Sequence, residues 1–192
     1  MASADRRQHL LAAAGGLVAA RGWTGLTMQQ LAEAAAVSRQ LVYEHFVSLD
    51  ELRIALLVHL FEPIYAATGA ITRSPRDVHE VLRDAYALVL ALPAEQRVLL
   101  RVLVNGETAG APDLGALRQT LRRRVASLWT PLVTSETGLR GGEARSLAWA
   151  VIVAGFALAD LVESRELGRK AASDLFVRIA EAALAGSRTA SR

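Results

Sequence analysis

The amino-terminal part of the chain repeats apolar residues at helical spacing and interrupts them with residues that cap helices. A first helix is predicted over residues 5–21, and it ends at Gly22, the residue type that most readily takes the left-handed conformation after a helix. A second is predicted over residues 28–35, with Thr27 as N-cap and Gln30 completing a capping box. The apolar face of the first helix is formed by Leu10, Leu11, Ala14, Leu17 and Val18.

Two serines open the next two predicted helices. Ser38 caps a short helix whose Leu41, Val42 and Phe46 are expected to face inward. Ser48 caps a longer helix that has acidic residues in its first turn and is expected to reach Pro63 or slightly beyond.

The rest of the chain contains apolar residues at helical spacing and no run with strand alternation. We therefore expect an all-α protein. Helix breaks are predicted at residues 72–75, 92–93, 106–112, 137–142 and 167–168, and fraying is predicted over residues 186–192.

Three short helices with a tight turn before the third are the geometry of a helix-turn-helix that reads DNA. Ala32 and Ala35 are small enough to let the second and third helices approach closely. Arg39 and Gln40 lie in the first turn of the third helix, where side chains reach guanine and adenine edges, and the side chains beyond them can meet phosphates. The predicted DNA-binding residues are Thr27, Gln29, Ser38, Arg39, Gln40, Tyr43 and His45.

Residues 6–57 resemble the tetracycline-repressor (TetR) family of bacterial transcriptional regulators. The resemblance rests on "LLAAAGGLVAARGWTGLTMQQLAEAAAVSRQLVYEHF" followed by "SLDEL". It implies an all-helical homodimer in which residues 1–50 form a three-helix helix-turn-helix domain that binds a palindromic operator. Residues 51–192 would then form a larger helical domain with the ligand pocket and the dimer interface.

Three positions depart from the family's usual pattern. Ala36 stands where the turn usually has glycine, and a left-handed alanine there costs on the order of 1 kcal/mol. Gln40 and Leu41 replace a small residue and a threonine, which removes a hydroxyl and adds a long side chain that can read bases. Leu49 replaces a lysine, so one phosphate contact is expected to be missing.

Charge does not mark the helix-turn-helix as a basic patch. The chain of 192 residues has a net charge of +3, yet acids and bases match one for one as far as Arg53. Glu44 lies on the reading helix, where it could accept from a cytosine amino group or repel the DNA backbone. Arg6 and Arg7 are expected to form a short arm toward phosphate or the minor groove. The weak basic balance keeps one alternative open, a helical protein–protein interaction module that has lost DNA binding.

The carboxy-terminal part contains an almost uninterrupted apolar segment, residues 146–162, and an amphipathic last helix over residues 172–185. A helix that is apolar on every side must be buried on every side, here by its own core and by a second subunit, and the resemblance implies a homodimer through these two helices. The segment is shorter than the roughly 20 apolar residues of a membrane span, so no membrane partner is expected.

An effector pocket needs apolar walls and a few polar groups. The candidate ligand-binding residues are Phe61, Tyr65, Tyr86, Asn105, Trp129, Trp149 and Phe156. Core packing is an open alternative for each aromatic residue. The composition of this set favours a small hydrophobic or aromatic effector.

The function predicted is that of a ligand-responsive transcriptional regulator, a repressor, with no enzymatic activity, cofactor or metal. The chain has no cysteine, and His9, His45, His59 and His79 show no metal-ligand spacing. Residues 1–20 lack the features of a signal peptide, so a cytoplasmic location is expected.

Overall fold

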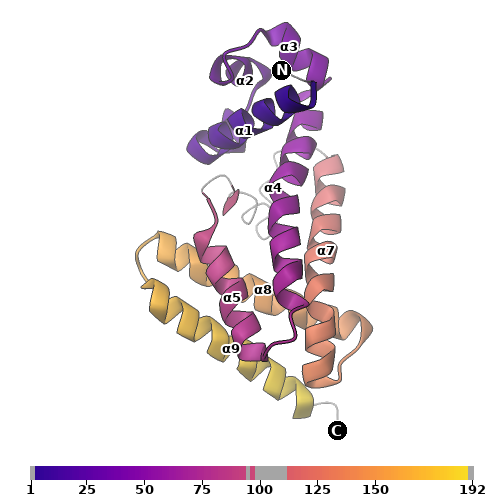
Figure 1. Ribbon diagram of the computed structural model, residues 1–192, viewed down its shortest axis with the longest axis vertical. Coiled ribbons are helices and arrows are strands. Elements are labelled where there is room, and N and C mark those ends of the chain that lie inside the picture. Colours follow the sequence, from indigo (N-terminus) through magenta and orange to yellow (C-terminus); the bar gives the residue numbers. More distant parts are fainter. Residues whose placement is uncertain (1–2, 94–95, 98–111, 190–192) are drawn as a thin grey trace. The chain divides into compact units, whose positions relative to one another are not determined.

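The computed structural model describes residues 3–93, 96–97 and 112–189, and these residues contain helices and turns but no strand. The expected all-α fold is therefore confirmed. In chain order the elements are α1 (Ser3–Arg21), the 3₁₀ turn η1 (Trp23–Gly25), α2 (Met28–Ala34), α3 (Arg39–His45), α4 (Leu49–Thr72), α5 (Val78–Ala91), α7 (Pro112–Thr137), α8 (Gly141–Glu163) and α9 (Arg169–Thr189) (Figure 1).

The short helices begin where side chains replace missing backbone partners. Thr27 Oγ1 accepts a hydrogen bond from the backbone N–H of Gln30 at 3.1 Å, and Ser38 Oγ accepts from that of Leu41 at 3.2 Å. Each bond satisfies one of the N–H groups that a helix leaves free at its start. Both predicted N-caps are confirmed.

Helix α4 also begins as predicted but runs further than expected. Ser48 Oγ accepts from the N–H of Glu51 at 3.1 Å, and the Glu51 carboxylate accepts from the N–H of Val47 at 2.7 Å. The helix then continues through Pro63 to Thr72, so the predicted end near the proline is wrong. A proline inside a helix removes one backbone hydrogen bond, and the burial of neighbouring apolar residues such as Phe61 opposes that loss.

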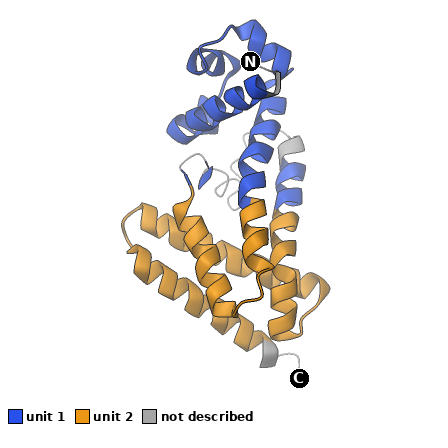
Figure 2. Ribbon diagram, viewed as in Figure 1, with its two compact units in different colours: residues 1–64, 93–121 blue, residues 65–92, 122–192 orange. Residues whose placement is uncertain are grey.

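The described structure divides into two compact units (Figure 2). One unit contains residues 1–64 and 93–121, and the other contains residues 65–92 and 122–192. Two of the three boundaries fall inside helices, α4 and α7, so each of these helices contributes residues to both units, and the third boundary follows the end of α5.

In the first unit, α1 packs against α2 and α2 packs against α3. His9 Nε2 on α1 donates to the carbonyl oxygen of Ala35 at 3.3 Å, and the guanidinium of Arg7 lies 4.6 Å from the centre of the Phe46 ring. The expectation of a free arm at Arg6 and Arg7 is therefore wrong, because both belong to α1 and Arg7 stacks on the core.

In the second unit, α5, α8 and α9 pack against one another. Gly155 on α8 allows a close approach to α9, since a Cβ there would lie 2.9 Å from Phe176 Cε2. The Phe176 ring in turn stacks on Tyr86 of α5, with 4.6 Å between ring centres and 14° between planes. These three residues join the three helices at one point.

Two carboxy-terminal expectations are corrected. Helix α9 continues past Gly186 to Thr189, where fraying had been expected. Helix α8 extends beyond residues 146–162 to Gly141–Glu163. Among the residues that the structure describes, α8 and α4 are the two helices long and apolar enough to cross a membrane by length and composition alone. The length of the apolar segment therefore does not exclude a membrane span, although core helices of soluble proteins pass the same test.

Candidate functional site

The turn between α2 and α3 is closed by two backbone hydrogen bonds around a left-handed alanine. Ala36 has a φ of 53°, its N–H donates to Glu33 O at 3.2 Å, and the N–H of Val37 donates to Ala32 O at 3.0 Å. This pair of bonds is the Schellman motif that ends many helices, usually with glycine in the left-handed position. Ala36 therefore has the left-handed conformation whose energetic cost was considered from the sequence.

Helix α3 has one buried face and one exposed face. Val42 and the following Phe46 are fully buried, whereas Leu41, which was also expected to face inward, is only half-buried. Arg39, Gln40 and Tyr43 are exposed, so the side chains capable of hydrogen bonding to DNA point away from the core. Burial of the apolar face thus fixes which side of α3 is available to a partner.

The predicted DNA-binding residues all lie in the first unit, on α2, α3 and their N-caps. Six of the seven are exposed and His45, at the end of α3, is half-buried. The Thr27 hydroxyl donates to Gln30 Oε1 at 3.1 Å, so both its donor and its acceptor are engaged in the capping interaction. Ser38 Oγ accepts within the cap, which leaves its O–H to donate to a phosphate.

Two matching side-chain pairs lie on α2 and α3. Gln29 Nε2 donates to Glu33 Oε1 at 3.0 Å, and Gln40 Nε2 donates to Glu44 Oε1 at 3.3 Å. All four residues are exposed and each pair is spaced by one helical turn. Gln40, a predicted reader, is therefore held beside a carboxylate, a contact that we did not predict from the sequence.

Val47 is the exposed residue that sequence reasoning missed. It follows Phe46 in the turn before α4, and 82% of its surface is accessible. An apolar residue directly before an N-cap usually packs back onto the helix that follows, so its position gave no signal of exposure.

Comparison with known proteins identifies this arrangement. Residues 10–56, which contain the caps, the turn and α3, match the family model described as "Bacterial regulatory proteins, tetR family". The chain belongs to the TetR family of bacterial transcriptional regulators. TetR-family regulators are DNA-binding transcription factors and not enzymes.

The similarity to individual relatives extends beyond the helix-turn-helix. A TetR-like transcriptional regulator from Rhodococcus sp. RHA1 is 26% identical, with a TM-score of 0.77 over 97% of this chain and 99% of its own. A second Rhodococcus transcriptional regulator, 20% identical, shares the fold with a TM-score of 0.79 over 95% of this chain and 97% of its own. The HTH-type transcriptional activator FasR of Mycolicibacterium smegmatis is 24% identical over 148 residues, which are 77% of this chain and 68% of that protein.

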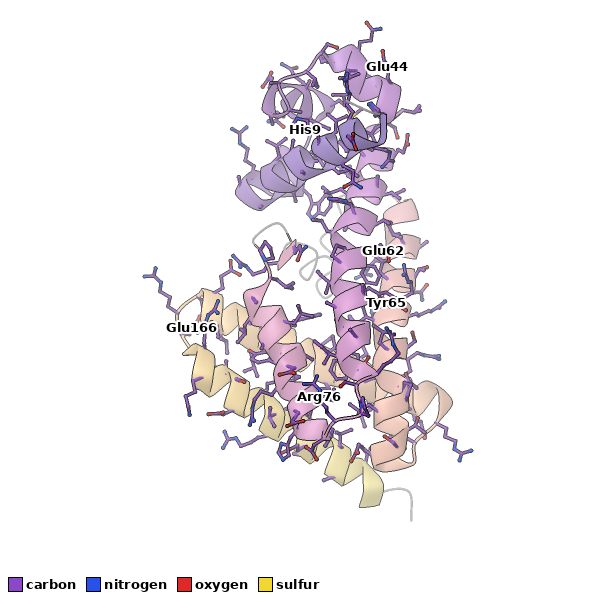
Figure 3. The ribbon with its side chains drawn as sticks, viewed as in Figure 1. His9, Glu44, Glu62, Tyr65, Arg76 and Glu166 are labelled. Atoms are coloured by element: carbon purple, nitrogen blue, oxygen red, sulfur yellow. The ribbon has the colours of Figure 1, made fainter. Side chains whose placement is uncertain are left out.

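The structure brings together four of the seven ligand-binding candidates of this TetR-family chain. Tyr86 and Trp129 belong to the buried core of the second unit, and Trp149 and Phe156 pack against it. Tyr65, which is labelled in Figure 3, is in the same unit. The Arg124 guanidinium lies 4.4 Å from the centre of the Tyr65 ring. The two remaining candidates are Phe61, which is buried in the other unit, and Asn105, which lies outside the described residues.

Tyr86 is the one buried candidate with an unused polar atom. Its side chain is 1% exposed, and its hydroxyl has no hydrogen-bond partner within the described structure. Burial disfavours the charged phenolate and raises the pKa of Tyr86 to about 12. The hydroxyl is therefore a neutral group inside an apolar cluster, with a free donor.

Arg122 on α7 places a positive charge beside Trp149 on α8. The Arg122 guanidinium lies 4.6 Å from the centre of the Trp149 ring, a distance typical of cation–π contact. In the portion of the chain that is described, no group of three or more His, Cys, Asp or Glu side chains could hold a metal ion.

Proposed function

We propose that this protein is a homodimeric, ligand-responsive repressor that binds a palindromic operator and is released by a small hydrophobic or aromatic effector. The observation that carries the proposal is the exposed polar face of α3, which follows the hydrogen-bonded turn at Ala36. Residues 1–50 would read DNA, residues 51–192 would bind the effector and dimerise, and the protein would act in the cytoplasm without a membrane partner.

The proposed DNA contacts follow from side-chain chemistry. Arg39 pairs with a guanine edge and Gln40 reads a base beside it. Tyr43 and His45 donate to phosphates further along α3. The exposed starts of α2 and α3, with Thr27, Gln29 and Ser38, approach the sugar–phosphate backbone and set the register of the reading helix.

Apolar surface on α8 and α9 supports the proposed dimer interface. Leu161 on α8 and Ile179 on α9 are each 37% exposed, a high fraction for large apolar side chains. Only 28% of the most apolar window of α8 is buried within one chain. A second copy packed on these helices would cover that surface, and a two-fold dimer would place two reading helices about 34–36 Å apart.

The effector is proposed to bind beside the aromatic cluster of Tyr86, Trp129, Trp149 and Phe156. The unused hydroxyl of Tyr86 supports an apolar ligand with a hydrogen-bond acceptor, because binding would give this buried group its missing partner. The effector must bind the DNA-incompetent dimer better than the DNA-bound form, and a coupling of about 1–3 kcal/mol is typical. The long helix α4 contributes residues to both units and is the proposed route of that coupling.

The proposal is tested by selecting bound duplexes from a random DNA pool at a stated salt concentration. We expect a palindromic sequence to be enriched, and Arg39→Ala to lose the preference at one position of each half-site. Failure of the wild-type protein to bind any duplex at low salt would instead favour the alternative, a protein–protein interaction module. A promoter fusion to a reporter gene measures whether the protein represses or activates transcription. This test matters because the relative FasR is an activator.

The dimer is tested separately with Ile179→Glu, which places a charge on the proposed interface. We expect this variant to sediment as a monomer and to lose operator binding. The neighbouring exposed Arg178 provides the control, because Arg178→Gln changes charge on α9 without altering the apolar surface. If Ile179→Glu remains dimeric, the interface lies elsewhere.

A further inference from the structure

The exposed face of α3 carries two rows of side chains with different hydrogen-bonding chemistry. Arg39 and Tyr43 lie one turn apart in the first row, and Gln40 and Glu44 lie one turn apart in the second. Arg39 offers only donors, whereas the Glu44 carboxylate can only accept. Figure 3 labels Glu44 on α3, in the same unit as His9 of α1. Base edges that face this helix would therefore meet donors on one side and an acceptor on the other.

Glu44 has a neutral partner and no cationic one. Its Oε1 accepts from Gln40 Nε2 at 3.3 Å, and no ion pair to Glu44 is formed within the ranges that the structure describes. The contrast with Asp50 is direct, since that exposed carboxylate is paired with Arg53 at 3.1 Å. The Glu44 charge therefore remains uncompensated on the surface proposed to face DNA.

An uncompensated carboxylate enters a DNA groove at an energetic cost. The phosphates make the groove negative, and the carboxylate gives up water when it is enclosed there. A hydrogen-bond donor on a base edge can offset this cost. In the major groove cytosine presents an amino donor, adenine presents one beside its N7 acceptor, and thymine presents an acceptor where cytosine has its donor, so cytosine matches a carboxylate best.

We propose that Glu44 is a specificity-determining residue that selects cytosine at one position of each operator half-site and rejects thymine. This inference rests on the proposed function, because it requires α3 to enter the major groove. Glu44 contributes discrimination and lowers affinity for sequences that lack the cytosine. The near balance of acids and bases in the first unit has the same consequence, weak binding to non-cognate DNA.

The test compares Glu44→Gln with wild type on duplexes derived from the selected operator. Each C·G pair of the half-site is changed in turn to T·A, and dissociation constants are measured at fixed salt. The wild-type protein is expected to prefer C·G by about tenfold at one position. Glu44→Gln is expected to reduce that preference to less than about twofold and to bind random-sequence duplex more tightly.

The chain offers a matched control in Glu33→Gln. Glu33 is also exposed, also accepts from a glutamine one turn earlier and loses the same charge on substitution, but it lies on α2. Glu33→Gln is expected to keep the cytosine preference of the wild-type protein. Melting temperatures and sedimentation of both variants verify that folding and assembly are unchanged.

The outcomes separate this inference from the proposed function. If the wild-type protein binds an operator and Glu44→Gln keeps the same cytosine preference, the role of Glu44 is overturned while DNA binding stands. If both glutamine variants strengthen binding to every duplex equally, Glu44 acts only through its charge and the inference is again overturned. If the wild-type protein binds no duplex, the proposed function itself fails.

Discussion

Ala36 tests whether the turn between α2 and α3 is strained. Its φ of 53° lies in the left-handed region, and its N–H and that of Val37 close the Schellman motif, so the conformation cannot change without breaking the turn. A residue with a Cβ pays about 1–2 kcal/mol in this conformation, which glycine avoids. Ala36 is exposed, so removal of its methyl group leaves no cavity. Ala36→Gly should therefore relieve strain without loss of packing.

The gain is partly offset in the unfolded state. Glycine adds conformational freedom to the unfolded chain and costs about 0.4–1 kcal/mol relative to alanine. The net stabilisation expected from Ala36→Gly is then about 0.5–1 kcal/mol. For a protein of this length that corresponds to a rise in melting temperature of about 1–4 °C.

The assay is thermal unfolding of wild type and variants, followed by far-ultraviolet circular dichroism at one fixed protein concentration, since dimerisation makes the melting temperature concentration-dependent. The matched control is Ala12→Gly, an exposed position inside α1 with helical backbone, which should lose about 0.5–1 kcal/mol. Hydrogen exchange at Val37, whose N–H closes the turn, reports the local effect and should slow in Ala36→Gly. A melting temperature that falls in Ala36→Gly as it does in Ala12→Gly would refute the strained left-handed backbone.

Three further predictions concern packing, titration and DNA contacts. Gly155→Ala should destabilise the protein by about 1–3 kcal/mol, because the added Cβ would meet Phe176 at 2.9 Å. The control Gly16→Ala lies in α1, where an added Cβ would have nothing within 4 Å, and it should stabilise the protein by about 0.4–1 kcal/mol. Urea unfolding measures both changes. Tyr86 has a folded-state pKa of about 12, above its unfolded value of 10.0, because burial disfavours the phenolate. Its contribution to stability is therefore fully present below pH 10.0. About 2–3 kcal/mol of the free energy of unfolding is lost as pH rises toward about 12. Urea unfolding across this pH range should show that loss in wild type and not in Tyr86→Phe, and an equal slope in both would contradict the assignment. Leu49→Lys at the start of α4 should add a phosphate contact. The slope of log Kd for the operator against log salt concentration should then steepen by about 0.9, as measured by titration at several salt concentrations. An unchanged slope would show that this position does not face a phosphate.

Sequence reasoning predicted the local features of the DNA-reading unit well. The caps at Thr27, Ser38 and Ser48 depend on hydrogen bonds to residues three positions ahead, so the sequence around each serine or threonine contains all the information needed. The left-handed Ala36 followed from the same kind of local comparison with the family's glycine. The exposed face of α3 followed from helical periodicity, although Leu41 is less buried than that periodicity indicated.

The features that were predicted wrongly from the sequence, or not predicted at all, depend on contacts between residues distant in sequence. Arg7 was expected in a free arm, but it stacks on Phe46, a contact that exists only after α1 has packed against the core. The path of α4 through Pro63 was missed because the burial that opposes the proline's cost is tertiary. The same holds for the unpartnered hydroxyl of Tyr86, which no local pattern marks.

The sequence alone thus determined the helical class, the family and the side of α3 that carries polar groups, because periodicity, capping and turn chemistry act over a few residues. Only the tertiary structure decided which polar groups elsewhere in the chain are engaged and which are left without a partner. Arg7 on α1 stacks on the distant Phe46, whereas the hydroxyl of Tyr86 is buried without a hydrogen-bond partner among the described residues. Whether a charge or donor is satisfied depends on which atoms the folded chain places beside it, and periodicity carries no information about that.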